Sequence, residues 1–306
     1  MKNKLIVNLS NDIGNQMFMY AAGYSFSEHM KRELYFDDET TYKKLKNIYR
    51  YKLDIFNLSG KKAPKDLKFL GIDGYIKKKI LRFSDKFKKN KKFFREYKDK
   101  NKITCFNDNF LNHRFDKNLF LDGHFESEKY FFSIKDKIRK EFTFKNRDTF
   151  KKDKLYLELA NSESVCICIR QHRFSEKVHK ITKYDVEKSL NFVKEQVNYI
   201  KIACEFIKQK ISNPKFYLWT NDHANLSHLF PSNFYTLIKK RDVDIDLFLM
   251  TQAKHFIVIP STFNWWGAWL SDNNNKIVVR PSNNFFNNFK INNNDFWPDK
   301  WIKLNK

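Results

Sequence analysis

The sequence predicts an α/β protein with two domains, the second of them doubly wound. With 306 residues, the chain can bury one large core or, more typically, two. Short apolar runs alternate with helical patterns in both halves, which is typical of parallel sheets. The polar, basic stretch 142–154 lies between the halves and indicates a linker. We therefore expect domains at residues 1–155 and 156–306.

The first half opens with a βαβ unit. The apolar run 5–9 (LIVNL) predicts a strand, residues 14–30 predict a helix, and residues 33–36 predict a second strand. We expect another strand at residues 119–122 and a helix around residues 127–140. The charged stretch between these parts has no clear periodicity.

The second half alternates more regularly. We expect strands at residues 165–169, 216–219, 256–259 and 276–279, and helices at residues 184–210, 222–230, 245–253 and 264–270. Doubly wound sheets bind ligands beyond the carboxyl ends of their strands. The loops at residues 170–175, 220–222 and 260–264 are therefore expected to share one edge and to hold a ligand there.

Composition limits the class of protein. A hydrophobic content of 42% and an aromatic content of 17% exclude a disordered chain. The net charge of +24 favours acidic partners: nucleic acid, nucleotide diphosphates or an anionic membrane surface. We expect no signal peptide, because residues 1–9 lead straight into polar residues. We expect no transmembrane span, because no run of about 18 apolar residues occurs. The four cysteines have no paired spacing, which predicts free thiols in a reducing compartment.

The positive charge is concentrated in residues 75–102, which hold thirteen Lys or Arg against three acidic residues. Apolar residues recur there at helical spacing: Ile76, Ile80, Phe83, Phe87, Phe94 and Tyr97. The pattern predicts a basic amphipathic helix inserted in the first domain. Such a helix suits the surface of an anionic membrane. The alternative is that its apolar face packs on its own domain.

The most informative segment is residues 256–269, FIVIPSTFNWWGAW. A buried strand is followed by Pro260, and Ser261 and Thr262 can cap a helix whose first turn carries Asn264. Helix N-termini bind anions because free N–H groups and the helix dipole both face the ligand. The alternative is an ordinary strand–turn–helix with aromatic core residues.

Basic and small polar residues follow two other predicted strands. Arg170, His172 and Arg173 follow the strand at 165–169, and a guanidinium group can hold a phosphate by two bonds. The alternative is a basic surface loop. Thr220, Asn221 and Asp222 follow the next strand. Together with the helix at residue 261, these loops could hold a sugar nucleotide diphosphate.

No metal site is expected. The acidic residues Asp242, Asp244 and Asp246 precede or begin a predicted helix, where negative charge is stabilising. Residues 37–39 (DDE) are explained by a turn. No His/Cys spacing is typical of a zinc site.

Four segments together resemble the bacterial α-1,2-fucosyltransferases, the galactoside 2-L-fucosyltransferase family. They are residues 14–21 (GNQMFMYA), 49–57 (YRYKLDIFN), 121–131 (LDGHFESEKYF) and 246–269, which ends in STFNWWGAW. The similarity runs nearly from end to end of the chain.

The resemblance implies a GT-B-like fold, in which two Rossmann-type domains flank a cleft. It also implies GDP-L-fucose as donor, the 2-hydroxyl of a galactoside as acceptor, inversion at the anomeric carbon, and neither metal nor cofactor. The family's donor motif is similar to H-x-R-R-x-D. Here the first arginine is Arg170, whereas Cys168, Gln171 and Arg173 replace the other motif residues.

This comparison leads to a set of expected site residues. Arg170 would neutralise the leaving diphosphate, and Asp222 could accept a hydrogen bond from guanine. The acceptor's base stays open between His172, Glu176, His179 and Asp12. The expected donor contacts are Gly14, Asn15, Arg170, Arg173, Thr220, Asn221, Asp222, Ser261, Thr262 and Asn264.

Two other classes of protein stay open. One is another inverting glycosyltransferase that uses a different sugar nucleotide on the same scaffold. The other is a basic nucleic-acid-binding protein, which fits the charge but not the loops at the strand ends. For a fucosyltransferase of this kind we expect a cytoplasmic location, with peripheral contact at the inner face of the cytoplasmic membrane.

Overall fold

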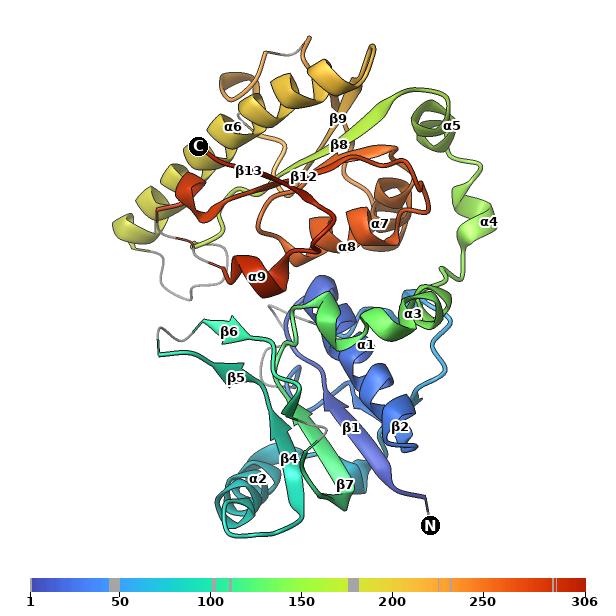
Figure 1. Cartoon of the computed structure of the whole chain (residues 1–306), viewed down its shortest axis with the longest axis vertical. Helices are drawn as coiled ribbons and strands as arrows, with labels where there is room; N and C mark the ends of the chain where they lie inside the picture. The colour runs from blue at the N-terminus through green and yellow to red at the C-terminus, as the bar shows by residue number, and fades with distance from the viewer. Residues whose placement is uncertain are drawn as a thin grey trace. The chain divides into compact units, whose positions relative to one another are not determined.

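The computed structural model describes residues 2–43, 50–100, 103–109, 112–175, 182–224, 226–231, 233–287, 289 and 291–306. The chain divides into two units, Met1–Lys145 and Asn146–Lys306, each built around its own parallel sheet (Figure 1). The second unit begins before residue 156 because Phe150 packs against Phe248 with ring centroids 5.5 Å apart.

Unit 1 contains a five-stranded parallel sheet in the order β3-β2-β1-β7-β4 and a two-stranded antiparallel sheet of β5 and β6. Its strands are β1 (Lys4–Asn8), β2 (Glu33–Asp37), β3 (Lys61–Lys62), β4 (Lys91–Arg95), β5 (Tyr97–Lys98), β6 (Thr104–Cys105) and β7 (Phe115–Asp122). Its helices are α1 (Ile13–His29), α2 (Gly71–Asp85) and α3 (Lys135–Glu141), with short 3-10 helices at Leu53–Ile55, Lys65–Leu67, Glu128–Tyr130 and Phe132–Ile134.

The predicted βαβ opening is confirmed. Strand β1 pairs in parallel with β2 on one side and with β7 on the other. Strands β2 and β3 lie on one side of β1, whereas β7 and β4 lie on its other side. The direction in which the chain adds strands to the sheet therefore reverses between β1 and β7. The loops after these two strands leave the sheet at this switch point, where open α/β sheets form ligand crevices.

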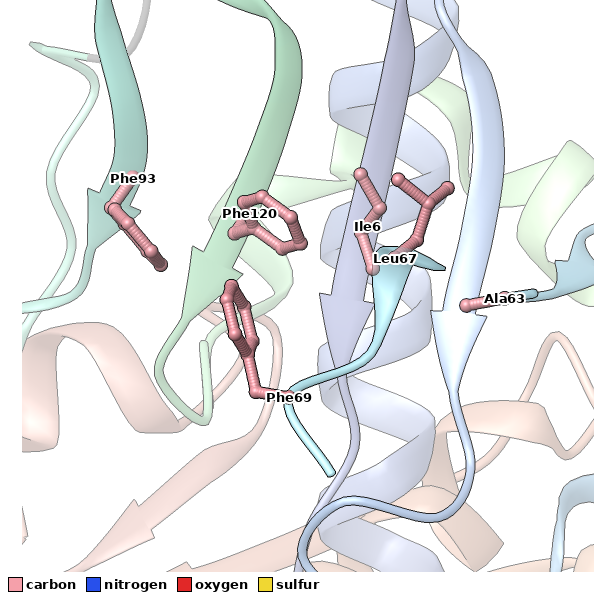
Figure 2. Packing of buried hydrophobic residues seen from close by; sticks show 6 residues of the cluster. All are labelled: Ile6, Ala63, Leu67, Phe69, Phe93 and Phe120. Atoms are coloured by element: carbon pink, nitrogen blue, oxygen red, sulfur yellow. The ribbon is translucent and has the colours of Figure 1, made fainter. Parts of the chain in front are cut away.

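An apolar cluster covers one face of the unit 1 sheet. Figure 2 shows the rings of Phe69, Phe93 and Phe120 gathered beside Ile6 of β1. The Phe69 and Phe120 centroids are 4.9 Å apart. Leu81 of α2 packs against this cluster, so α2 is attached to the sheet through that side of the helix.

The predicted helix across residues 75–102 is wrong in its second half. Helix α2 ends at Asp85, whose carboxylate accepts hydrogen bonds from the N–H groups of Lys92 (2.6 Å) and Phe93 (3.2 Å). The following residues form β4, which pairs with β7. Phe94 is consequently buried in the sheet rather than aligned with the helix. Pairing with a strand distant in sequence outweighs the local helical spacing.

Unit 2 contains a six-stranded parallel sheet in the order β10-β9-β8-β11-β12-β13. Its strands are β8 (Ser164–Ile169), β9 (Lys215–Thr220), β10 (Thr236–Leu237), β11 (His255–Ile257), β12 (Val278–Pro281) and β13 (Ile302–Leu304). Its helices are α4 (Arg147–Phe150), α5 (Lys154–Ala160), α6 (Lys183–Lys210), α7 (Val243–Thr251), α8 (Thr262–Leu270) and α9 (Asn293–Phe296), with 3-10 helices at Leu226–His228 and Asn283–Phe285.

The doubly wound order predicted for the second half is confirmed. Strand β8 lies between β9 and β11, so the order of strand addition reverses at the β8–β11 boundary. All six residues of β8 are buried, which explains their continuous apolar run. The expected helix at residues 222–230 is reduced to one 3-10 turn at Leu226–His228.

Helices α7 and α8 pack closely because of one glycine. A Cβ atom at Gly267 would lie 2.4 Å from the Sδ of Met250, so a larger residue would require the Met250 side chain to shift. Trp265 and Trp266 are fully buried, and the Trp265 indole donates a hydrogen bond to the Phe296 carbonyl (2.8 Å). The tryptophans of this segment thus form the core that holds α8 in place.

All four cysteines are free thiols. Cys166, Cys168 and Cys204 are buried, and Cys105 is half-buried. Burial raises the pKa of the Cys204 thiol and the pKa of the Cys166 thiol. Cys166 and Cys204 are therefore protonated packing residues.

Candidate functional site

Three of the loops singled out in the sequence meet in unit 2, as expected from the order of its strands. They follow β9, β8 and β11, which are neighbours in the sheet. Side chains join the loops directly: Gln171 bonds to Asn221, and Arg173 reaches the carbonyl of Pro260 (3.5 Å). The site lies at the switch point of a doubly wound sheet, the usual position of a ligand crevice.

The backbone of Arg170 is held by a buried glutamine. Gln196 of α6 is fully buried; its Oε1 accepts from the Arg170 N–H (2.9 Å), and its Nε2 donates to the Arg170 carbonyl (2.9 Å). This double contact fixes the point at which the chain leaves β8. Gln196 therefore positions Arg170 at the carboxyl end of the sheet.

The side-chain amide of Asn221 joins the loops after β8 and β9 by pairing with the backbone of Gln171. The Asn221 Oδ1 accepts from the Gln171 N–H (2.7 Å), while the Asn221 Nδ2 donates to the Gln171 carbonyl (2.9 Å). Thr220 closes the adjacent turn, because its hydroxyl donates to the Asp222 carbonyl (2.7 Å). These contacts give Thr220 and Asn221 a structural role in addition to their expected role at the donor.

His172 and Asp222 form a close pair. The His172 Nε2 lies 2.7 Å from the Asp222 Oδ2, and the other carboxylate oxygen of Asp222 accepts from the Ala224 N–H (2.9 Å). The Ala224 N–H and His172 together lower the pKa of Asp222, so the carboxylate is ionised at neutral pH. The backbone of His172 is left-handed (φ 57°), a strained conformation for a histidine that is often found at functional sites.

Arg173 is stacked on an aromatic ring. Its guanidinium carbon lies 4.0 Å from the centroid of Phe289 and 5.7 Å from that of Phe192. The contact to the Pro260 carbonyl connects the loop after β8 to the loop after β11, whereas the stacking connects it to the segment after β12. The expected role of Arg173 as a second cation at the diphosphate stays a prediction.

The loop after β11 leads into the N-terminus of α8 as expected. Ser261 is the N-cap residue and Thr262 is the first helical residue, although the Ser261 side chain makes no capping hydrogen bond. Asn264 is only 1% exposed, and its Oδ1 accepts from the Ile259 N–H (2.9 Å). This burial favours a role for Asn264 in shaping the turn rather than in direct contact with a ligand.

A polar cluster lies at the switch point of unit 1. Gly14 and Asn15 are in the first turn of α1, and the Asn15 amide donates to Glu126 Oε1. The Asn11 Nδ2 lies 3.0 Å from the His124 Nε2. The loop after β1 is thus joined to the loop after β7. Two strained residues, Asn11 (φ 59°) and Phe125 (φ 53°), occur in these loops.

Glu96 holds the loop after β7. Its two carboxylate oxygens accept from the N–H groups of His124 (2.9 Å) and Phe125 (2.6 Å). Burial raises the pKa of Glu96 and lowers the pKa of His124, so the histidine is neutral at pH 7. Glu96 and His124 also line a cavity of about 480 Å³, with Arg82, Arg95, Lys98, Asp122 and Gly123.

Two candidate bases, Glu176 and His179, lie outside the described residues. A third, Asp12, caps α1 by accepting from the Ile13 N–H (2.8 Å), and it pairs with Lys52 (2.6 Å). The sequence did not single out Gln196 or Glu96, because each acts on a segment about 26 to 28 positions away in the chain. His124 and Glu126 were within a family-like segment but had no assigned role.

The acidic residues at 37–39 have structural partners. Lys68 pairs with Asp38 (2.7 Å) and Glu39 (2.8 Å), while Asp37 Oδ1 accepts two backbone N–H groups in the turn that follows β2. Across the described residues, no group of three or more His, Cys, Asp or Glu side chains is placed to hold a metal ion.

Asp246 should make the protein's stability depend on pH. Burial raises the pKa of this carboxyl in α7 from 3.8 to about 6. The folded chain therefore binds this proton more tightly than the unfolded chain. The resulting stabilisation is complete below about pH 3.8 and is lost as the pH rises through 6. It amounts to up to about 3 kcal/mol.

We expect Asp246→Asn to unfold at higher urea concentration than the parent at pH 7 and at a similar concentration near pH 4. Urea titrations at several pH values measure this difference. Asp148→Asn is the matched control, because the Asp148 side chain is 95% exposed. A parallel pH dependence in the parent and in Asp246→Asn would contradict the assignment.

No helix in the part of the chain that the structure describes has both the length and the apolar character needed to cross a membrane.

Comparisons with known proteins identify the family. Residues 6–305 match the model of glycosyl transferase family 11. The alpha-1,2-colitosyltransferase of Escherichia coli is 24% identical over 99% of this chain and 99% of its own length. The O-antigen biosynthesis glycosyltransferase WbnK of Escherichia coli is 26% identical over 97% of this chain and 99% of its own.

A solved structure supports the fold. NodZ, an α-1,6-fucosyltransferase crystallised and soaked with GDP-fucose, superposes with a TM-score of 0.52 at 14% identity, over 88% of this chain and 93% of its own. NodZ from Bradyrhizobium superposes with a TM-score of 0.50 at 13% identity, over 87% and 92% of the two chains. The expected GT-B-like class, α/β with two parallel sheets, is confirmed. The chain belongs to glycosyl transferase family 11.

Proposed function

We propose that this glycosyltransferase transfers L-fucose from GDP-L-fucose to the 2-hydroxyl of a galactoside, with inversion and without a metal. The observation that carries the proposal is the position of Arg170. It follows β8 at the switch point of the unit 2 sheet, beside the loop that starts α8. A guanidinium group and a helix N-terminus together suit a diphosphate.

In the proposed reaction, the bond between fucose C1 and the diphosphate oxygen breaks, and its electron pair leaves with GDP. Arg170 neutralises the charge that develops on the diphosphate. Ser261 and Thr262 are proposed to lie beside the phosphate oxygens, because negative charge is stabilised at the N-terminus of a helix. Asp222 and Asn221 would then lie toward the nucleoside.

The galactose hydroxyl forms the new bond to C1 and loses its proton. His172 is the base that the geometry supports best among the described candidates, because the Asp222 carboxylate 2.7 Å away can orient its ring. With ionised Asp222 accepting from the Nε2–H, the Nδ1 atom is the one that can take the proton. Asp12 is less suitable, since it caps α1 and pairs with Lys52.

The acceptor side of the reaction is assigned to unit 1. The cavity beside Glu96 and His124 is large enough for a sugar residue, at about 480 Å³. It is lined by Gly123 and His124 of the loop after β7. The same loop carries Glu126, which accepts a hydrogen bond from Asn15 in the first turn of α1. Gly14 and Asn15 are proposed to contact the donor from this unit.

The nearest alternative to fucose as the transferred sugar is colitose, because the names of two similar proteins mention these two sugars. NodZ was solved with GDP-fucose, whereas one Escherichia coli relative is named for colitosyl transfer. Colitose is fucose without its 3-hydroxyl. A site that hydrogen-bonds this hydroxyl should reject the deoxy sugar by roughly 10⁴-fold, whereas an apolar site would discriminate far less.

A binding experiment tests the donor. We expect GDP and GDP-fucose to raise the melting temperature of the protein, with UDP-sugars as the matched negative panel, because a bound ligand stabilises only the folded state. Turnover of GDP-fucose and GDP-colitose on β-galactosides, followed by linkage analysis, then identifies sugar and linkage. If neither GDP nor either GDP-sugar shifts the melting temperature, the proposed donor class is wrong.

A further inference from the structure

Helix α2 carries a row of large apolar side chains that face water. Ile72, Ile76, Ile80 and Phe83 are 78%, 49%, 62% and 65% exposed, and Phe87, two residues past the helix end, is 79% exposed. Their spacing of four, four, three and four residues places them along one side of the helix. We call this row the α2 stripe. Contiguous exposed apolar surface of this kind marks an interaction site.

The stripe is not the side on which α2 packs. Leu81 contacts the core cluster of unit 1, and Arg82 and Lys78 both bond to Asp122 of β7. The inner side of the helix is therefore already fixed to the sheet. Phe83 and Phe87 contact each other instead, with ring centroids 5.6 Å apart. The alternative weighed from the sequence, in which these apolar side chains pack on their own domain, is wrong for the α2 stripe.

A basic rim surrounds the stripe. Its members share high exposure and make no ion pair with any residue that the structure describes: Lys77, Lys79, Lys86, Lys88 and Lys89. Long lysine side chains can extend their ammonium groups beyond a buried apolar surface. The rim lysines therefore place positive charge directly beside the exposed apolar row.

We propose that the α2 stripe and its basic rim form a docking surface for an anionic lipid bilayer. The apolar side chains would enter the boundary between headgroups and acyl chains, while the rim lysines contact lipid phosphates. Arg82, on the inner side of the same helix, lines the unit 1 cavity. This proposal does not depend on which sugar the enzyme transfers.

Charge decides between a bilayer and a second copy of the chain. Two α2 stripes placed face to face would bring two lysine rims together, and like charges at that distance oppose association. An anionic bilayer satisfies both the apolar row and the rim. Partner proteins without acidic charge would leave the rim unpaired.

Co-sedimentation with vesicles tests the surface. We expect the protein to pellet with vesicles of phosphatidylglycerol and phosphatidylcholine at low salt, and to remain in the supernatant with phosphatidylcholine alone. Raising the salt concentration to about 0.5 M should weaken binding, because screening shortens the reach of the rim charges. Equal recovery in the supernatant with both lipid mixtures overturns the proposal.

Two kinds of variant separate the stripe from the rim. Phe83→Asp should weaken partitioning roughly tenfold or more, since one aromatic side chain no longer inserts. Lys77→Glu with Lys79→Glu should weaken binding mainly at low salt. Leu190→Asp is the matched control, because Leu190 is 57% exposed on α6 and should have no effect.

Two further measurements keep the outcomes distinct. Melting temperatures show whether Phe83→Asp folds normally, and the shift caused by GDP reports on the proposed donor site separately. Sedimentation velocity measures self-association. A dimer that is lost in Phe83→Asp, with no binding to either vesicle, would assign the α2 stripe to a second copy of the chain instead.

Discussion

Arg170→Ala is expected to lower kcat/KM for GDP-fucose by roughly a hundredfold or more. The guanidinium is proposed to stabilise charge that develops on the leaving diphosphate, and removing one such group commonly costs about two to three orders of magnitude. Gln196 holds the Arg170 backbone through two hydrogen bonds of 2.9 Å, so the side chain starts from a fixed point. Initial rates at several donor concentrations measure the effect.

Two further variants sharpen this test. Arg170→Lys keeps the charge but loses the planar fork, so it should recover only part of the activity. Arg147→Ala removes one exposed arginine in a different segment of unit 2 and should leave kcat/KM unchanged. Near-normal transfer by Arg170→Ala would remove Arg170 from the proposed mechanism.

Gln196→Leu is expected to lower both stability and activity. Leucine cannot pair with the N–H and carbonyl groups of Arg170, and an unpaired buried polar group costs about 1–3 kcal/mol. The melting temperature should therefore fall. The chain at Arg170 should also lose its fixed position, so kcat/KM should fall by at least about tenfold.

Gln252→Leu provides the comparison for this variant. Gln252 follows α7, and its amide bonds to the Phe248 carbonyl (3.2 Å) and the Thr251 hydroxyl (2.6 Å), away from the three loops. It should lower stability without a matching loss of kcat/KM. If Gln196→Leu lost stability but kept full activity below its melting temperature, Gln196 would be structural only and would not position Arg170.

Local sequence patterns were sufficient for much of the fold. The buried strands β1, β8 and β11 appear as continuous apolar runs, because strands covered on both faces leave little place for polar residues. Pro260 and Ser261 correctly indicated the end of one strand and the start of α8. The three loops could be assigned to one edge because parallel strands end on the same side of a sheet.

The helix prediction failed where a distant partner decided the structure. Residues 91–95 have apolar spacing compatible with α2, yet they form β4 against β7. Residues 91–95 form a strand rather than a helix because they pair with residues more than twenty positions later in the chain. Such pairing cannot be recognised from the spacing of Phe87 and Phe94 alone.

By itself, the sequence determined the alternation of strands and helices and the family-like segments. It also determined which loops carry Arg170, Asp222 and Ser261. All of these features depend on residues that are neighbours along the chain. Only the tertiary structure decided which groups hold those loops and which apolar side chains stay in water. Gln196 reaches Arg170, Glu96 supports His124, and Phe83 remains exposed because Leu81 takes the inner side of α2. Each of these depends on residues that are distant in sequence and adjacent only after folding.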